Sequence, residues 1–463
     1  MTTIHKLSAL DLSHSYATGE LSPVEVTRAI LEHIDACEPK LNAMYLLQSE
    51  SALEQAQAAE ARWRKRTPLS PLDGVPITLK ENIVTKGDPA PIGTAAADFT
   101  PKDFDAPPAA RVREAGCVLL GKTTMPDFGM LSSGVSSLHG VTRNPWQLDR
   151  NTSGSSSGAG AAAAAGYGPL HLGTDIGGSV RLPAAHCGVF GHKPSLGRVP
   201  IYPPYMARVT GPMARNVCDA ALLMNVLIAP DTRDFMSLPY ESIDFTNLTL
   251  EPRGLRIGLL REMKVGLPVH SEVANAVAVA ARALEQVGAI VEEIDSFLTP
   301  EMLDGAASFF EVRAYNDFSA LPPERQAKLL PFIAEWCSHR AKNFSGRDVM
   351  AALNQIFICR EAAVRATQPF DFLLSPTSPI LPYEAEHACP GNDPHDALPH
   401  IAFTVPWNLS EQPAASVNWS FSSDGLPIGV QIIGKRFDDI GVLRLAQLIE
   451  TLRPTQRPWP MLQ

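Results

Sequence analysis

The sequence predicts an α/β fold in which helices cover both faces of one large, mixed, mostly parallel β-sheet. Between about residues 70 and 300, short apolar runs typical of buried strands alternate with longer helical patterns. Strand-like runs return after about residue 370, which indicates that distant parts of the chain complete one sheet. The 463 residues are 45% hydrophobic, enough for a large core. We therefore expect a single domain over residues 1–463, with N-terminal helices over about 1–66 and a mainly helical insertion over about 299–367.

The N-terminal part carries the start signals of two helices. Ser22 is a typical N-cap and Pro23 fits the first helical position. Apolar residues then follow at four-residue spacing from Val26 to Ile34, which favours one amphipathic helix. A second helix is expected over about 51–64.

The first strand is short and ends in a lysine. A turn-forming segment, 71–76, precedes the apolar run 77–79, and Lys80 follows at once. An isolated lysine at the end of an apolar strand is usually a surface charge. A function for Lys80 therefore depends on what the rest of the sequence places beside it.

The other elements follow from apolar periodicity and turn residues. Helices are expected over 107–115, 125–131, 214–228, 272–287 and 441–452. Strands are expected over 117–120, 255–260, 372–374, 415–417 and 428–433.

The stretch 151–198 contains two turns rich in glycine and serine. The first, 151–160, leads into the alanine run 161–165, and the second covers 173–183. Such turns can present hydroxyls and free backbone N–H groups at helix N-termini, where negative charge is favoured. In outline, this is an oxyanion site.

Other interpretations of these turns are weaker. A flexible linker does not fit the strongly helical alanine run. A G-x-S-x-G match centred on Ser156 would need a buried strand directly before it, and 144–150 does not have the pattern of a strand. The second turn could be a phosphate-binding nest, but no Gly-Lys-Ser/Thr follows it, so a P-loop is not supported.

Composition narrows the class of protein further. The formal net charge of −10 argues against a nucleic-acid or anionic-membrane surface. The seven cysteines form no C-x-x-C pair, which fits a reduced, cytoplasmic protein. We expect neither a secretion signal nor a membrane span, because the start lacks an apolar core and no apolar run approaches about 18 residues.

The spacing of these motifs resembles that of the amidase signature enzymes. Ser179 lies 24 residues after Ser155, and Lys80 lies 75 residues before it. The resemblance covers most of the chain and is carried by the segments 74–82, 151–160, 173–183, 191–195, 211–215 and 424–429. It implies the amidase signature fold and serine amidohydrolase chemistry, with no metal and no organic cofactor.

The resemblance also implies roles for individual residues. Ser179 would be the nucleophile, Ser155 the bridging serine after a cis peptide, and Lys80 the general base. The N–H groups expected to hold the oxyanion are those of Ile176, Gly177, Gly178 and Ser179. Supporting positions are Gly154, Thr174, Asp175 and Arg181, of which the last two are expected to pair. Core packing is an equal alternative for the four expected pocket residues, Met125, Met130, Leu131 and Ser132.

The chemistry explains why a buried lysine is needed. A serine hydroxyl is a weak nucleophile and must lose its proton as it attacks. A neutral Lys80 can take that proton through Ser155. This requires lowering the lysine pKa by about 3 units from about 10.4, or about 4 kcal/mol, which burial can supply.

The sequence offers two competing sites and several departures from the family pattern. A Ser-His-Asp triad could use His171, His186 or His192, although His186 lies about 10 Å along a helix from Ser179. A zinc site could use His387, Cys389, His395 and His400, although their spacing matches no standard pattern. The departures are Ser153 and Ser157 in place of glycine, Glu81 in place of aspartate, His192 in place of an apolar or aromatic residue, and the loop 93–96.

We therefore expect an amidase that cleaves the C–N bond of small aryl or alkyl carboxamides, with carbamates (urethanes) and esters as additional substrates. The first alternative is the amidase subunit of a glutamine-dependent tRNA amidotransferase, although segment 202–206 does not resemble such subunits. The second is a non-catalytic binding or scaffold protein with an inherited site. The expected partners are small-molecule substrates without nucleic acid or membrane, and the expected state is a monomer or homodimer.

Overall fold

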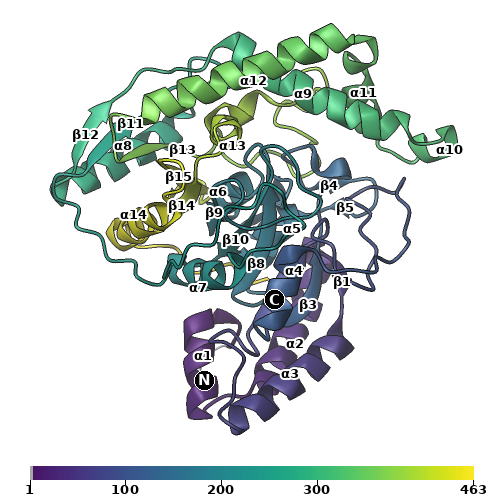
Figure 1. Ribbon diagram of the computed structural model, residues 1–463, viewed down its shortest axis with the longest axis vertical. Coiled ribbons are helices and arrows are strands. Elements are labelled where there is room, and N and C mark those ends of the chain that lie inside the picture. The colour runs from purple at the N-terminus through teal and green to yellow at the C-terminus, as the bar shows by residue number, and fades with distance from the viewer. Residues whose placement is uncertain (1–3, 463) are drawn as a thin grey trace.

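An 11-stranded β-sheet forms the centre of the computed structural model, which describes residues 4–462 (Figure 1). From one edge to the other, its strands are β1 (Met44–Leu47), β3 (Val118–Thr123), β2 (Pro76–Lys80), β8 (Leu170–Asp175), β10 (Val209–Ala214), β9 (Phe190–Lys193), β14 (Ala414–Phe421), β15 (Pro427–Gly434), β13 (Phe372–Pro376), β11 (Arg256–Leu259) and β12 (Ile290–Glu293). β9 pairs with β14 although more than 200 residues separate them in sequence. Distant parts of the chain therefore complete one sheet, as predicted.

The sheet is mixed, as predicted, and its parallel pairs lie in two groups. β3, β2 and β8 are parallel to one another, and so are β13, β11 and β12. All neighbours from β8 through β10, β9, β14 and β15 to β13 pair antiparallel, as β1 does with β3. Parallel pairing is thus confined to the two flanks of the sheet.

Two small hairpins lie outside this sheet. β4 (Val135–Ser136) pairs with β5 (Gly140–Val141), and β6 (Arg143–Asn144) pairs with β7 (Gln147–Asn151). The prediction that 144–150 is not a strand is therefore wrong. β7 escaped detection because it is polar and mostly part-exposed, so it has no apolar alternation.

Helices form the rest of the regular structure. In the described residues, the α-helices are α1 (Ala9–Thr18), α2 (Pro23–Leu41), α3 (Ser49–Arg64), α4 (Pro107–Glu114), α5 (Ser157–Ala165), α6 (Arg181–Cys187), α7 (Val217–Leu227), α8 (Ser271–Gln286), α9 (Pro300–Ser319), α10 (Pro323–Gln326), α11 (Pro331–Ser338), α12 (Gly346–Thr367), α13 (Val405–Leu409) and α14 (Asp439–Leu452). The short 3₁₀ turns are η1 (Ile4–Lys6), η2 (Asp127–Gly129), η3 (Ala341–Asn343) and η4 (Pro399–Phe403).

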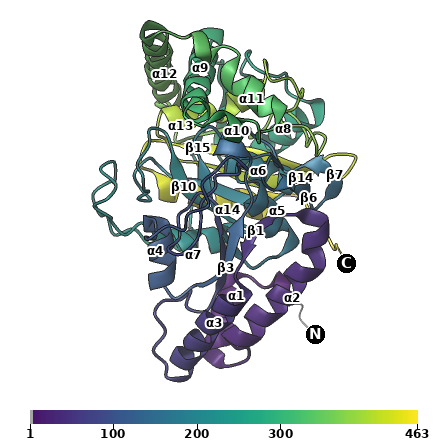
Figure 2. The ribbon, with the colours of Figure 1, turned by 90° about the vertical axis from the view of Figure 1, so that its right-hand side faces the viewer.

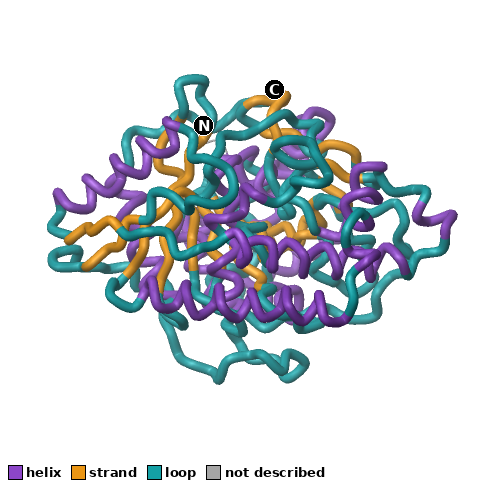
Figure 3. Tube along the Cα trace, turned by 90° about the horizontal axis from the view of Figure 1, so that it is seen from above, coloured by secondary structure: helices purple, strands orange, loops and turns teal. Residues whose placement is uncertain are grey.

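Helices cover both faces of the sheet, as the alternation of side chains along β15 shows. A Cβ on Gly429 would lie 2.7 Å from Ala185 of α6, whereas a Cβ on Gly434 would lie 2.6 Å from Val442 of α14. Successive residues of a strand point to opposite faces, and positions 429 and 434 are an odd number of residues apart. α6 and α14 therefore lie on opposite sides of β15. Figure 3 shows the strands between helices and loops when the molecule is seen from above.

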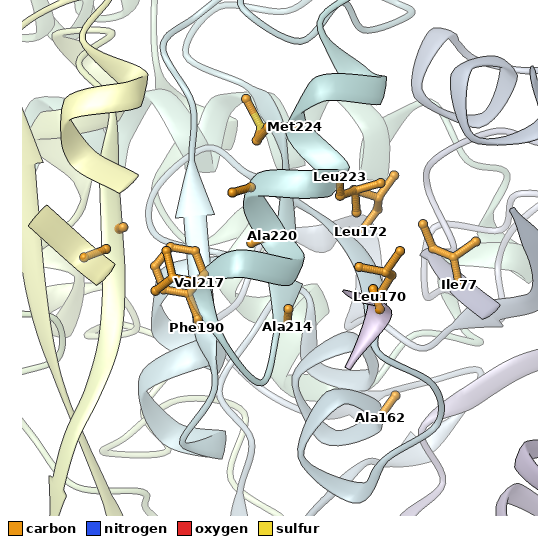
Figure 4. Close-up of a cluster of buried hydrophobic side chains, with 14 of the residues drawn as sticks. Ile77, Ala162, Leu170, Leu172, Phe190, Ala214, Val217, Ala220, Leu223 and Met224 are labelled. Atoms are coloured by element: carbon orange, nitrogen blue, oxygen red, sulfur yellow. The ribbon is translucent and has the colours of Figure 1, made fainter. Parts of the chain in front are cut away.

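The main core lies between the sheet and the helices that pack on it. Figure 4 shows the apolar side chains of α7 beside residues of β8 and β9, such as Leu172 and Phe190. The labelled core residues are Ile77, Ala162, Leu170, Leu172, Phe190, Ala214, Val217, Ala220, Leu223 and Met224. Burial at this interface fixes the positions of β2 and β8, whose ends carry the candidate site.

Predicted helical regions lie at the two ends of the molecule (Figure 1, Figure 2). The N-terminal end contains α1 to α3, and the other end contains α9 to α12. Ser22 caps α2 by accepting the Glu25 N–H at 3.1 Å, as its sequence predicts. β1 was not expected within 1–66, because its four half-buried residues are too few for a clear pattern.

The helix expected over 125–131 is wrong. Only the short turn η2 forms there, and Phe128 within it has a φ of 53°. Gly129 also has a positive φ of 65°, so two consecutive residues leave the helical region. Strands β8, β9, β10 and β12 were not predicted. β8 was not predicted because its last residues, 173–175, belong to the segment 173–183, which the sequence pattern indicated to be a glycine-rich turn.

Candidate active site

Lys80 and Thr174 meet at one edge of the sheet because β2 and β8 are parallel neighbours. Lys80 ends β2, and Thr174 precedes the last residue of β8. The lysine is fully buried, and its Nζ donates to Ser155 Oγ at 2.8 Å and to Thr174 Oγ1 at 3.0 Å. Asn82 Nδ2 also donates to Thr174 Oγ1, at 3.1 Å. The structure therefore brings Lys80, Ser155 and Thr174 together, far from the surface role that is usual for lysine.

Ser155 lies in the tightly packed turn before α5. The peptide between Gly154 and Ser155 is cis, as the resemblance implies. A Cβ on Gly154 would lie only 2.5 Å from the Ser133 carbonyl oxygen, so this position has no room for a side chain. Close packing of the turn holds the Ser155 hydroxyl against Lys80.

Ser179 lies in the turn between β8 and α6, beside the Ser155 turn. The Ser156 N–H donates to the Ser179 carbonyl at 3.2 Å, and the Ser156 hydroxyl bonds both backbone groups of Thr174 at 3.2 Å. Ser156 therefore joins the two turns, and Ser179 lines a cavity. The bonded, buried hydroxyl of Ser156 agrees with reading its G-x-S-x-G match as accidental.

The second turn is held by an ion pair between Asp175 and Arg181, as predicted. The guanidinium donates to both carboxylate oxygens at 3.0 Å, and both side chains are fully buried. Asn408 Nδ2 also donates to Asp175, at 2.8 Å, and Gln431 accepts from Arg181, also at 2.8 Å. Burial raises the pKa of Asp175, but the charge and hydrogen bonds of Arg181 outweigh it and hold the pKa well below its usual range.

The backbone N–H groups of this turn divide into two sets. The Gly178 N–H donates to Asp175 Oδ1 at 2.8 Å, so it is engaged within the turn and does not fit the predicted oxyanion role. By contrast, the N–H groups of Ile176, Gly177 and Ser179 find no acceptor within residues 4–462. Gly178 is still needed, because its φ is 129° and a Cβ there would lie 2.4 Å from Thr404 Oγ1. Three of the four predicted donors are thus free to bind an oxyanion.

The buried lysine has a pKa far below the usual value, so a substantial fraction of it is neutral at physiological pH. Burial lowers the pKa of Lys80 from 10.5 to about 7, against the opposing charges of Asp175 and Glu81. An amine with this pKa can accept a proton near pH 7. Because Lys80 is hydrogen-bonded to Ser155, it can receive a proton from another hydroxyl group by way of the Ser155 hydroxyl.

Two adjoining cavities open onto the serines. The cavity beside Ser155, of about 210 Å³, is also lined by Asn82, Thr174 and the charged residues Arg208 and Arg313; we call it the Ser155 cavity. The smaller cavity, of about 20 Å³, is lined by Ser179 and by apolar residues that include Met130, Phe310 and Ile401; we call it the Ser179 cavity. Gly129 and Ile176 line both cavities, which therefore adjoin at this point.

The four expected pocket residues separate into two pairs. Met130 and Ser132 line the Ser179 cavity. Met125 and Leu131 are each 1% exposed and line neither cavity, so they pack in the core instead.

The competing histidines have other partners. His171 bonds Thr78 Oγ1 at 2.8 Å, and His186 bonds Ser378 Oγ at 3.2 Å. His192 lies 3.7 Å from Asp439. Within residues 4–462, no three histidine, cysteine or acidic side chains come close enough to hold a metal ion. None of the helices described is long and apolar enough to cross a membrane.

Glu81, one of the departures from the family pattern, makes two short polar contacts. The Glu81 carboxylate accepts the Gly93 N–H at 2.6 Å and lies 2.5 Å from His139 Nε2. Glu81, which directly follows Lys80, therefore connects the end of β2 with the unusual loop 93–96. The Ser157 hydroxyl makes only a long bond, at 3.4 Å, to the Thr124 carbonyl.

Sequence reasoning missed several residues of this site. Asn82 lies in segment 74–82, which carries the resemblance, and its position two residues after Lys80 could have suggested a role. Arg208 and Arg313 come from the segment before β10 and from α9, and no spacing connects them to the serine turns. Asn408 and Gln431 reach Arg181 from distant elements in the same way.

Comparisons with known proteins agree with this geometry. The family model described as Amidase matches residues 25–443. A glutamyl-tRNA(Gln) amidotransferase subunit from Chloroflexus aggregans is 36% identical, with 99% of each chain covered. The crystal structure of a bacterial aryl acylamidase of the amidase signature family has a TM-score of 0.90 at 30% identity, covering 97% of this chain and 96% of that one. The structure of 6-aminohexanoate cyclic dimer hydrolase complexed with substrate has a TM-score of 0.87 at 30% identity, covering 98% and 99%. The chain therefore belongs to the amidase family and is an amidase of the amidase signature type.

Proposed function

We propose that this amidase is a free-standing serine amidohydrolase that cleaves the C–N bond of carboxamides through an acyl-enzyme on Ser179. The observation that carries the proposal is the 2.8 Å hydrogen bond from the fully buried Lys80 to Ser155, whose turn is hydrogen-bonded to the turn that contains Ser179. A lysine whose pKa is lowered to about 7 by burial can act as a base at neutral pH.

The proposed reaction begins when Ser179 Oγ attacks the substrate carbonyl carbon. Its proton passes through Ser155 to the neutral Lys80. The N–H groups of Ile176, Gly177 and Ser179 hold the oxyanion, and one such donor is typically worth about 3–4 kcal/mol in the transition state. The C–N bond then breaks as the proton returns through Ser155 to the departing nitrogen. Water hydrolyses the acyl-enzyme by the same route, which releases the acid and restores Ser179.

Aryl and alkyl amides are the proposed main substrates, with carbamates (urethanes) and esters as additional ones. The same nucleophile, base and oxyanion donors would serve each of these acyl groups. The structural neighbour named as an aryl acylamidase supports the aryl amides. A cytoplasmic location and a monomeric or homodimeric state remain predictions.

A second candidate is the amidase subunit of a glutamine-dependent tRNA amidotransferase. Curated relatives named as subunits of a glutamyl-tRNA(Gln) amidotransferase, from Chloroflexus aggregans and Chloroflexus aurantiacus, are 36% and 35% identical over 99% of the chain. They support this candidate more directly than the free hydrolase. In this role, glutamine would be the amide, and partner subunits and tRNA would be required. A silent scaffold is a weaker idea, because the buried lysine remains bonded to Ser155.

One experiment separates these candidates. The purified chain is given an anilide alone, glutamine alone, and glutamine with added amidotransferase subunits and tRNA, and the acyl-enzyme is sought by mass spectrometry. The free hydrolase predicts anilide turnover and an adduct on Ser179 that are both lost in Ser179→Ala. A matched control, Ser319→Ala, changes an exposed serine of α9 and should leave the rate unchanged. Turnover of glutamine only with the added components would instead support the amidotransferase subunit.

A further inference from the structure

Two arginines converge on the Ser155 cavity. Arg208 immediately precedes β10, and Arg313 comes from α9, and both line this cavity together with Ser155. Their guanidinium carbons lie 5.8 Å and 4.3 Å from the centre of the Tyr205 ring. Both guanidinium groups therefore lie near the Tyr205 ring, in the wall of the cavity that Ser155 also lines.

Neither cation forms an ion pair with a carboxylate of the described residues. Arg208 donates to the Pro203 carbonyl, and no carboxylate of residues 4–462 lies within 4.0 Å of either guanidinium. Lys102 also lines the cavity, and its one acidic residue, Asp317, is exposed. The lining is thus net positive in a chain whose formal net charge is −10.

The electrostatic setting favours a bound anion. Burial, and then the like charge of Arg313, lower the pKa of Arg208 to about 10, so the guanidinium is still protonated at neutral pH. Holding like charges together in a partly buried site is unfavourable, and an anion between them relieves this cost. The planar fork of a guanidinium matches a carboxylate, which it can bind through two parallel hydrogen bonds.

The positions of the two serines indicate which half of the substrate carries the anion. In the proposed reaction, Ser155 returns the proton to the departing nitrogen, so the amine half must lie on the Ser155 side. The lining of the Ser179 cavity includes Met130, Phe310 and Ile401 and contains no charged residue, so the Ser179 side offers no cation to the acyl half. Arg208 and Arg313 therefore lie on the side of the site that holds the amine half of the substrate.

We propose that the preferred substrates are N-acyl amino acids or N-acyl aminobenzoates, in which the amine half carries a carboxylate that binds Arg208 and Arg313 in the Ser155 cavity. This inference rests on the proposed function and narrows its substrate class. Glutamine has the opposite arrangement, because its carboxylate belongs to the acyl half and its leaving group is ammonia.

The test compares three anilides that differ in the place of one carboxylate. They are the benzoyl amide of 4-aminobenzoate, the benzoyl amide of aniline, and the aniline amide of terephthalic acid, which carries the carboxylate on the acyl half. We expect kcat/KM for the first to exceed that for the other two by about tenfold or more, as for a charge-assisted hydrogen bond. The difference should lie mainly in KM, since the carboxylate is remote from the reacting atoms.

Variants show whether the arginines cause this preference. Arg208→Gln and Arg313→Gln should each raise KM for the benzoyl amide of 4-aminobenzoate more than KM for the uncharged anilide, so that the ratio of the two kcat/KM values falls toward one. Arg313→Lys should keep part of the preference, because it retains the charge but loses the fork. Arg347→Gln, at an exposed position of α12, is the matched control, and circular dichroism melting checks that each variant folds.

The outcomes are distinct. Equal kcat/KM for the charged and uncharged anilides, or a preference that survives in both glutamine variants, would refute the inference and leave the proposed hydrolase intact. A preference for the terephthalic amide would place the anion on the acyl half and equally refute it. Failure of the wild-type chain to hydrolyse any anilide would refute the proposed function and this inference together.

Discussion

Replacing Lys80 with methionine tests the base directly, because methionine matches the length of the stem but cannot accept a proton. General base catalysis typically contributes about 10²–10⁴-fold, so kcat for an anilide should fall by about that factor. In the wild type, burial lowers the pKa of Lys80 to about 7, so kcat/KM should rise with pH up to about 7 and then level off. The assay is anilide hydrolysis from about pH 5 to pH 10. A Lys80→Met variant that keeps near-normal activity, or a wild-type profile that is flat across pH 7, would contradict the role of Lys80.

Lys80→Met should also raise the free energy of unfolding. The direction of this change follows from the different proton binding of Lys80 in the unfolded and the folded chain. The unfolded chain binds a proton at this lysine below pH 10.5, whereas the folded chain binds it only below about pH 7. Stability therefore falls as the pH drops from 10.5 to about 7 and is constant below that. The difference between these pKa values costs the folded state about 4–5 kcal/mol at 1.36 kcal/mol per unit. The two hydrogen bonds lost to Ser155 and Thr174 offset about 2 kcal/mol of this gain.

We therefore expect Lys80→Met to raise the free energy of unfolding by about 3 kcal/mol at pH 7, measured by urea denaturation. The gain should shrink as the pH rises toward 10, where the unfolded wild-type chain no longer gains from protonating this lysine. A variant that is inactive and also less stable at pH 7 would show that the buried amine is held by favourable interactions, and the argument for a neutral base would fail.

Three further substitutions follow from the same geometry. Ser155→Ala should lower kcat by about 10²-fold or more with little change in KM, because it removes the proton route but no substrate contact; steady-state kinetics on an anilide checks this, and an unchanged kcat would speak against a bridging serine. Asp175→Asn leaves Arg181 buried without a counter-charge and should lower the free energy of unfolding by about 3–5 kcal/mol in urea denaturation; a loss below about 1 kcal/mol would show that the pair is dispensable. Gly154→Ala places a Cβ 2.5 Å from the Ser133 carbonyl oxygen and should cost about 1–3 kcal/mol together with most of the activity, whereas normal activity would mean that the turn has room to shift.

The sequence was most informative where function depends on short, local segments. The lysine that ends an apolar strand and the two glycine–serine turns could be recognised by their residues and spacing, and the resemblance assigned roles to Lys80, Ser155 and Ser179. The elements that failed are those decided by contacts across the chain. β8 carries Thr174 to Lys80 only because it pairs with β2, and a six-residue strand that ends in a glycine turn has no strong pattern of its own.

The site itself was predictable only in part, for a related reason. A run of N–H groups in a turn suggests oxyanion donors, but sequence cannot tell which of them the turn uses for itself. The Gly178 amide is taken by Asp175 at 2.8 Å, a bond that depends on the final shape of the loop. Arg313 reaches the Ser155 cavity from α9, more than 100 residues after the serine turns, so no local pattern could reveal it.

The arrangement of buried charges explains how the turn can contain an ionised aspartate while the pKa of the lysine beside it is lowered to about 7. Asp175 alone would favour the ammonium form of Lys80, and its charge does oppose the lowering of the lysine pKa. Arg181 binds both oxygens of that carboxylate at 3.0 Å, and Asn408 adds a further donor. The negative charge is therefore neutralised by a permanent cation, and burial can keep the pKa of Lys80 near 7. In the proposed mechanism the ion pair would serve catalysis in two ways, because it shapes the turn that carries the expected oxyanion donors and it leaves the lysine free to act as a base.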